Sequence, residues 1–311
     1  MWVISLAILP IFLLLVLGNL LRRNGFPGGE FWHHADRVTY WVLFPALLLH
    51  STTTAPFSED IVDTYAFALF SALAATALIS LLCVRIFKLS GPVGGSVFQG
   101  ATRHNTFIAV AVAEYLYGAH GLLLATVAIS LLVPVTNLLC VTVLVWFQGA
   151  SGTISLKRRL IQEIFRNPLL LAIILGVSLN LSGIGPLPVL HDLTGILSKA
   201  ALPFALLCVG AGLRIKAIHT GARYVTIATL CKMIIFPVVI TGIAILTGIE
   251  GVAAMVLVIY GVIPTASSGY ALAKLLSGDA EVMAGIITVQ TLISIVTIPL
   301  VLSFATGYFL P

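Results

Sequence analysis

The sequence predicts an all-α integral membrane protein of ten transmembrane helices, built as two inverted five-helix repeats. Of its 311 residues, 59% are hydrophobic and only 9% are charged, and the mean hydropathy is +1.13. A water-soluble domain has about a quarter of its residues charged, so most of this chain must face lipid. The net charge of +5 comes from scattered basic residues, which argues against a nucleic-acid partner.

The first apolar stretch, residues 2–21, is long enough to cross a bilayer. No basic residue precedes it, and Arg22 and Arg23 follow it, so we interpret it as a retained helix and not as a cleaved signal. Nine further spans are expected at 38–55, 61–84, 93–117, 121–146, 168–184, 191–213, 223–247, 251–276 and 280–306.

The basic residues indicate the orientation of these spans, because Lys and Arg favour the cytoplasmic side of short loops. With the N-terminus outside, the outer loops contain no Lys or Arg, and three basic residues (Arg103, Lys199 and Lys232) fall within spans. The other thirteen lie in inner loops or at inner helix ends: Arg22, Arg23, Arg37, Arg85, Lys88, Lys157, Arg158, Arg159, Arg166, Arg214, Lys216, Arg223 and Lys274. We therefore expect a bacterial inner-membrane protein with both termini on the outer face.

Two halves of opposite orientation follow from five spans each: residues 1–147, a cytoplasmic linker at 148–167, and residues 168–311. Leu43-Phe44-Pro45-Ala46-Leu47 in the second span resembles Leu202-Pro203-Phe204-Ala205-Leu206 in the seventh. Inverted repeats of this kind recur in secondary transporters. Chance similarity between Leu-rich segments is the alternative.

The 93–117 and 251–276 spans each contain a polar interruption. The first includes Arg103-His104-Asn105-Thr106, and the second includes Pro264-Thr265-Ala266-Ser267-Ser268 at an offset of 160 residues. Proline removes a helical hydrogen bond, and freed backbone groups inside a membrane need protein or a wet cavity around them.

Because the two spans run in opposite directions, their breaks would bring two half-helix N-termini together near the bilayer centre. Helix N-termini attract anions, and Asn105, with Thr265 or Ser267, is a suitable cap. We predict an anion site at Arg103, His104, Asn105, Thr106, Pro264, Thr265, Ser267 and Ser268. The alternatives are that Pro264 merely kinks its helix and that His104 is a satisfied core histidine.

The residues that carry a family resemblance are Phe44-Pro45-Ala46-Leu47, Arg103 to Phe107, Ala201 to Leu206 with Gly210, Pro264-Thr265-Ala266 and Ile298-Pro299. With these residues, the chain resembles the auxin efflux carrier family of permeases. The resemblance covers essentially the whole chain. It implies crossed, broken fourth and ninth helices, and a scaffold (first, second, sixth and seventh spans) moving against a transport core. It also implies organic-anion substrates such as malonate, malate or auxin-like acids. The chain departs from the plant members in lacking their long hydrophilic central loop, and in having Asn105 where a proline marks their crossing.

Further candidates lie outside the two interruptions. Pro45 and Pro203 are added to the substrate site, as is Lys232, which is deep in a span and must face the interior as a substrate ligand or as the partner of a carbonyl. Glu114, Thr126, Ser130, Gln290 and Ser294 are candidates for cation or proton coupling. The alternatives are that Glu114 lies at a solvated helix end, only a turn from the outer surface, and that the hydroxyl and amide groups join membrane helices. We expect no metal site and no cofactor.

These residues together predict a secondary transporter of small organic anions that works by alternating access, and not an enzyme. A sodium-coupled symporter of larger amphipathic acids and a ligand-binding membrane sensor are the alternatives. The expected partners are a small carboxylate, a proton or sodium co-ion, the lipid bilayer and a second copy of the chain in a homodimer.

Overall fold

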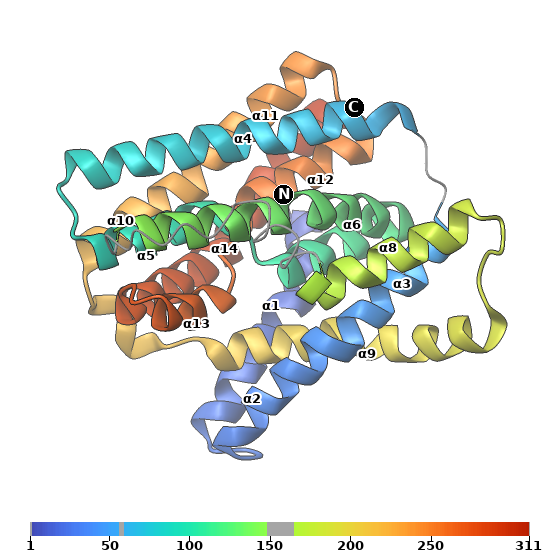
Figure 1. Ribbon diagram of the computed structural model, residues 1–311, viewed down its shortest axis with the longest axis horizontal. Coiled ribbons are helices and arrows are strands. Elements are labelled where there is room, and N and C mark those ends of the chain that lie inside the picture. Colours follow the sequence, from blue (N-terminus) through green and yellow to red (C-terminus); the bar gives the residue numbers. More distant parts are fainter. Residues whose placement is uncertain (1, 56–58, 148–164, 311) are drawn as a thin grey trace.

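The computed structural model describes residues 2–55, 59–147 and 165–310, and all regular structure in these ranges is helical (Figure 1). The predicted all-α class is therefore confirmed for the described part of the chain. Residues 148–164 of the predicted linker lie outside it.

The helices of the first half follow one another through short connections. They are α1 (Trp2–Arg23), α2 (Gly29–Val38), the π-helical turn η1 (Thr39–Leu43), α3 (Phe44–Thr53), α4 (Glu59–Ile86), α5 (Gly91–Thr102) and α6 (Thr106–Phe147). The long α6 contains a non-helical residue, Gly118, with φ 59°. Glycine tolerates this conformation because it has no Cβ, and it divides α6 close to the boundary predicted between the 93–117 and 121–146 spans.

The helices of the second half also follow one another along the chain. Its helices are α8 (Pro168–Leu181), α9 (Pro188–Gly212), the 3₁₀ turn η2 (Ile215–His219), α10 (Ala222–Leu230), the π turn η3 (Cys231–Ile235), α11 (Phe236–Thr247), α12 (Gly251–Val262), α13 (Ser268–Leu275) and α14 (Ala280–Phe309). Each of the two π turns is followed at once by a helix with proline in its first turn, at Pro45 and Pro237.

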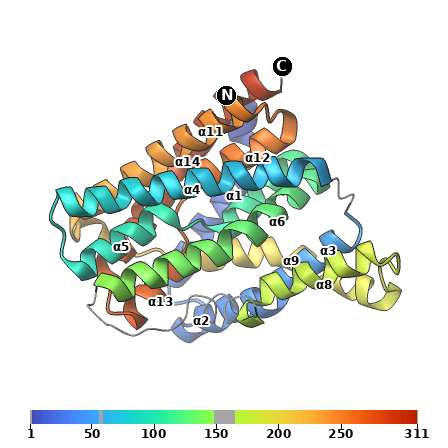
Figure 2. The same cartoon turned by 45° about the horizontal axis from the view of Figure 1, so that its top comes forward.

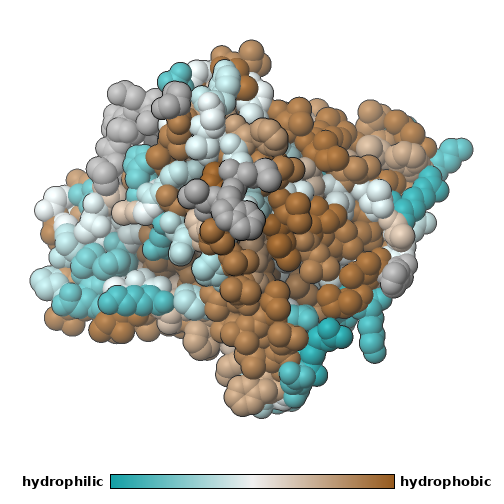
Figure 3. All heavy atoms as spheres, turned by 180° about the vertical axis from the view of Figure 1, so that it is seen from behind, coloured by the Kyte–Doolittle hydropathy of each residue, from teal (hydrophilic) through white to brown (hydrophobic). Residues whose placement is uncertain are grey.

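Six helical segments among the described residues are long and apolar enough to cross a membrane, and α8 and α12 are shorter apolar helices. One of the six, Gly91–Phe147, joins α5 and α6 and corresponds to two predicted spans. The structure thus supports a multi-pass membrane protein, while the count of ten stays a prediction. Figure 3 agrees with lipid contact, since hydrophobic residues cover the middle of the face it shows and hydrophilic residues gather towards its margins.

The helices form two groups. In one, α9 packs against α1 and α3, and α3 packs against α8; in the other, α4, α5, α6, α10, α11, α12 and α14 pack on one another. Figure 2 shows α3, α8 and α9 on one side and α4, α5 and α11 on the other. A buried hydrophobic core that includes Phe44, Phe107 and Phe236 joins the two groups.

Candidate functional site

The first break separates α5 from α6. Helix α5 ends at Thr102, and Arg103 has an extended backbone (φ −76°, ψ 157°). Helix α6 begins at Thr106, and Asn105 Oδ1 accepts a hydrogen bond from Ile108 N at 3.2 Å. A side-chain oxygen bonded to the third amide of a helix is an N-cap. The predicted cap at Asn105 is therefore confirmed.

The second break separates α12 from α13. Helix α12 ends at Val262, and Ile263 turns to an extended conformation (φ −70°, ψ 149°). Ser267 has helical dihedrals (φ −60°, ψ −29°) and makes no side-chain cap hydrogen bond to α13. The cap predicted at Thr265 or Ser267 is wrong, because a capping residue needs an extended backbone and the Thr265 hydroxyl bonds elsewhere.

The two breaks are bonded directly to each other. The amide of Asn105 donates to the Pro264 carbonyl at 2.9 Å, and Thr265 Oγ1 donates to the Gln99 carbonyl at 3.2 Å. From α14, Gln290 Oε1 accepts from Thr265 N at 2.9 Å, while its Nε2 donates to the Gly100 carbonyl at 3.0 Å. Gln290, a candidate for cation coupling, thus uses its amide to join the two breaks.

Lys232 lies in the π turn η3 and is fully buried. Its Nζ is 3.5 Å from the Tyr260 carbonyl oxygen and 4.2 Å from the centroid of the Phe236 ring. Tyr260 is four residues before Pro264, which has no amide hydrogen, so its carbonyl lacks the usual helical partner. A cation is favourable at a helix C-terminus. Of the two roles predicted for Lys232, the contacts favour the partner of a carbonyl.

Arg103 lies at the centre of the junction, with only 8% of its surface exposed. Its Nη2 donates to Ser268 Oγ at 3.0 Å, but its buried Nε and Nη1 have no hydrogen-bond partner among the described residues. Among the described residues, an ion pair forms between Arg214 and Glu281, and Arg103 forms none. Its guanidinium therefore has no carboxylate partner in this part of the chain. Both ring nitrogens of His104 are likewise buried and unpartnered there, and its ring packs edge-on against Phe236 at 4.7 Å.

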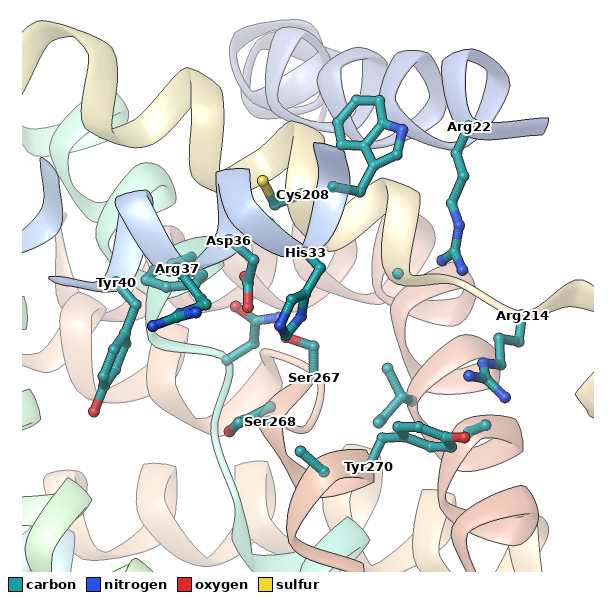
Figure 4. Close-up of a pocket in the computed structure, with 18 of the residues that line it drawn as sticks. Arg22, His33, Asp36, Arg37, Tyr40, Cys208, Arg214, Ser267, Ser268 and Tyr270 are labelled. Carbon is teal, nitrogen blue, oxygen red and sulfur yellow. The ribbon is translucent and has the colours of Figure 1, made fainter. Parts of the chain in front are cut away.

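Two cavities adjoin this junction. The larger, of about 480 Å³, lies between α2 and the breaks, and Figure 4 shows side chains from both pointing into it. The smaller, of about 170 Å³, is lined by Arg103 and His104. Thr106 and Ser268 line both cavities, and Asn105 and Ser267 line the larger one. The structure therefore brings six of the predicted anion-site residues to one connected region.

The remaining predicted residues line neither cavity. Pro264 and Thr265 hold the breaks together, and Pro45 and Pro203 lie in α3 and α9. Thr126, Ser130 and Ser294 each bond to a carbonyl of their own helix. Glu114 lies in α6 with a buried Oε2 that has no partner among the described residues. Their role in coupling stays a prediction.

Sequence reasoning missed the far wall of the larger cavity. The residues concerned come from α1, α2, η1, α13 and the connection after α9, and we had interpreted them only as topology signals or had not singled them out: Arg22, His33, Asp36, Arg37, Tyr40, Tyr270 and Arg214. One signal was available, because His33 and Asp36 are three residues apart and thus share a helix face. Protein atoms around Asp36 raise its pKa by desolvation, against a smaller opposing effect of His33.

Comparison with known proteins agrees with the resemblance predicted from the motifs. Residues 152–302 match the model of a family described as "Membrane transport protein", which is of the auxin efflux carrier type. A protein of Methanothermobacter thermautotrophicus (strain Delta H) named "Uncharacterized transporter" is 26% identical over 298 residues, which cover 94% of this chain and 95% of the relative. The predicted resemblance is confirmed: this chain is similar to membrane transport proteins of the auxin efflux carrier type.

Proposed function

We propose that this chain is a secondary transporter of small organic anions, which holds a substrate carboxylate at the junction of the two broken helices. The observation that carries the proposal is Arg103, a buried guanidinium with two unpartnered donor groups and no carboxylate counter-ion among the described residues. An unpaired buried charge is strongly unfavourable. A ligand carboxylate would remove that cost, because guanidinium and carboxylate match in a planar, two-pronged hydrogen-bond geometry.

The groups around Arg103 suit the same ligand. Ser268, which already contacts the guanidinium, lines both cavities, and Thr106 begins α6, whose N-terminus carries partial positive charge. Lys232 and His104 pack against the same Phe236 ring, and Lys232 lines neither cavity. The region thus combines positive charge with polar donors, which favours an anion of a few carbon atoms over a neutral or cationic solute.

We also propose an orientation of the helices in the membrane and the helix groups that move during transport. The ten spans form two inverted repeats with both termini on the outer face of a bacterial inner membrane, and the broken helices cross at the substrate. The larger cavity is lined by Arg22, Arg37 and Arg214, which the distribution of basic residues places on the inner side. In the proposed orientation, the larger cavity faces the cytoplasm. The group of α1, α3, α8 and α9 serves as the scaffold and dimer platform, and the other helices move against it.

Substitution of Arg103 tests this proposal. Malonate binding by purified Arg103→Ala should weaken about 30-fold or more, since losing one partner of a buried charged pair costs about 2–5 kcal/mol. Arg103→Lys should restore little, because an ammonium lacks the planar fork. Arg223→Ala is the matched control, since Arg223 lies over the Phe87 ring and lines neither cavity.

Two measurements decide the outcome. Calorimetry reports malonate affinity, and uptake of labelled malonate into proteoliposomes separates a transporter from a membrane sensor that only binds its ligand. Unchanged malonate affinity in folded Arg103→Ala would contradict the proposed site.

A further inference from the structure

We infer that Asp36 is the proton-exchanging group of this transporter, and that its carboxylate takes up a proton from the inner solution when the anion enters the larger cavity. The inference rests on the proposed function and extends it to the coupling ion. It also replaces the sequence-based coupling candidates, because none of Glu114, Thr126, Ser130, Gln290 and Ser294 lines either cavity.

The position of Asp36 is the first argument. Asp36 lines the same cavity as Asn105, Thr106, Ser267 and Ser268, which form its wall at the breaks. Figure 4 shows Asp36 and His33 descending from α2 towards Ser267. Among the residues that the structure describes, no other acidic residue lines the two cavities. An anion that reaches Arg103 from the inner side must therefore pass or remain beside this carboxyl group.

The second argument concerns the groups that face Asp36. The titratable or charged ones along this cavity are Arg22 from α1, His33, Arg37 and Tyr40 from α2 and η1, Cys208 from α9, Arg214, and Tyr270 from α13. Arg22 is held by the Ala211 carbonyl, and Arg214 is held by Glu281 and stacks over Tyr270 at 4.2 Å. Within the described part of the chain, Asp36 forms no ion pair. His33 is the neighbour whose charge acts on Asp36, and its effect on the pKa of Asp36 is smaller than that of burial.

The third argument is electrostatic linkage. Two negative charges in one cavity of about 480 Å³ repel each other, and the repulsion favours the protonated form of the carboxyl group. Burial already raises the pKa of Asp36 and so makes proton uptake easier. Linkage is reciprocal: if the anion promotes protonation, protonation must promote anion binding to the same degree. The loaded carrier then contains the anion and one additional proton, and the proton returns to solvent when the anion leaves.

Calorimetry of the purified full-length protein tests this linkage. Malonate is titrated in two buffers with different ionisation heats, at several pH values where malonate itself is fully ionised. Wild type should take up as much as one proton for each anion bound, and its Kd should rise by up to about tenfold for each pH unit. Asp36→Asn should bind malonate more tightly than wild type, without proton uptake and with a Kd independent of pH.

Transport supplies a second readout and a matched control. In proteoliposomes, an imposed pH gradient should accelerate malonate entry through wild type and have no effect on entry through Asp36→Asn. Glu114→Gln removes a carboxyl group that lines neither cavity, so it should keep the proton stoichiometry of wild type.

The outcomes separate this inference from the proposed function. Binding with undiminished proton uptake in Asp36→Asn, or no proton uptake in wild type, would overturn the role of Asp36 and leave the anion site intact. Absence of malonate binding in wild type would overturn the proposed function, and the coupling with it. Loss of proton uptake in Glu114→Gln but not in Asp36→Asn would assign coupling to α6.

Discussion

The side chain of Gln290 makes two hydrogen bonds that a continuous helix would not need. Its carbonyl oxygen accepts from Thr265 N and its amide donates to the Gly100 oxygen, so one residue of α14 satisfies one backbone group at each break. Lys232 does the same for the Tyr260 carbonyl, which Pro264 leaves without an amide partner. Single buried side chains thus replace the backbone bonds that the breaks remove, and the irregular backbone is tolerated inside the protein.

We expect Gln290→Leu to destabilise the protein. Leucine fills a similar volume but leaves Thr265 N and the Gly100 oxygen buried without partners, at about 1–3 kcal/mol for each group. The free energy of unfolding should fall by about 2–6 kcal/mol, seen as a lower melting temperature in detergent. Thr291→Val is the control on the same helix, since Thr291 Oγ1 bonds only to the Ile287 carbonyl of its own helix. Equal melting temperatures for the two variants would show that Gln290 does not support the breaks.

At the scale of the element, the break in the 251–276 span depends on one proline. Helix α12 stops at Val262 and α13 resumes at Ser268, and the Pro264 carbonyl receives the amide of Asn105 from the other break. The Tyr260 carbonyl is available to Lys232 only because residue 264 has no amide hydrogen. The break between α12 and α13 is therefore held by hydrogen bonds to other parts of the chain, and it is not a simple kink.

Pro264→Ala should bind malonate about tenfold more weakly, while its melting temperature stays equal to or above that of wild type. The new amide can bond to the Tyr260 carbonyl, extend α12 and draw the second break away from Arg103 and Ser268. A model in which Pro264 only kinks the helix expects the opposite result, a lower melting temperature with normal affinity. Melting temperature and malonate affinity measured on the same preparations distinguish the two.

Helices α1 and α9 approach each other closely at two glycines. A methyl group at Gly18 would collide with the Leu207 carbonyl oxygen, and one at Gly210 would collide with the Leu15 carbonyl oxygen. Small residues at such contacts let membrane helices pack backbone to backbone. Asn19 and Arg22 use this proximity, since both donate to carbonyls near the end of α9.

Gly210→Ala should therefore force α1 and α9 apart and lower the melting temperature, with an expected cost of about 1–3 kcal/mol for overpacking. Gly242→Ala is the control, because a methyl group there meets no atom within 4 Å. It lies inside α11, where alanine is the better helix former. A melting temperature for Gly210→Ala as high as that of Gly242→Ala would contradict the packing described for α1 and α9.

At the scale of the whole molecule, the two helix groups meet around the junction of the breaks, and residues of α2 line the larger cavity beside it. Figure 1 shows α2 projecting from the helix groups at the end of α1. Arg37 of α2, Arg22 of α1 and Arg214 line this cavity and give it a positive field. In the orientation proposed from the basic residues, this cavity lies on the inner side.

A reporter that is active only in the cytoplasm tests this orientation. Fused to either terminus it should be silent, and inserted near Gly152 it should be active, because the linker lies on the inner side in the ten-span arrangement. Fusion at Pro311 and insertion near Gly152 provide matched positions in the same chain. Cytoplasmic activity at the C-terminus would contradict the count of ten spans.

Several features were predictable from sequence because they depend on local pattern. Long apolar runs predict membrane helices, and the polar interruptions at Arg103 to Thr106 and Pro264 to Ser268 predict helix breaks, both of which occur. The cap at Asn105 was predictable because capping involves residues three apart in the chain. The cap at Thr265 or Ser267 failed because tertiary contacts with Gln99 and Gln290 determine the backbone there.

By itself, then, the sequence determined the helical membrane class, the positions of the breaks and the presence of a buried cation at one of them. Only the tertiary structure decided that Gln290 joins the breaks, that Lys232 serves a carbonyl, and that Asp36 shares a cavity with Ser267 and Ser268. Hydrophobicity and helix termination are local properties of the chain. The partner of a buried polar group depends on which distant helices pack together. The residues brought together are 190 and 28 positions apart in the two bonded pairs and about 230 positions apart across the cavity, so no local signal in the sequence predicts them.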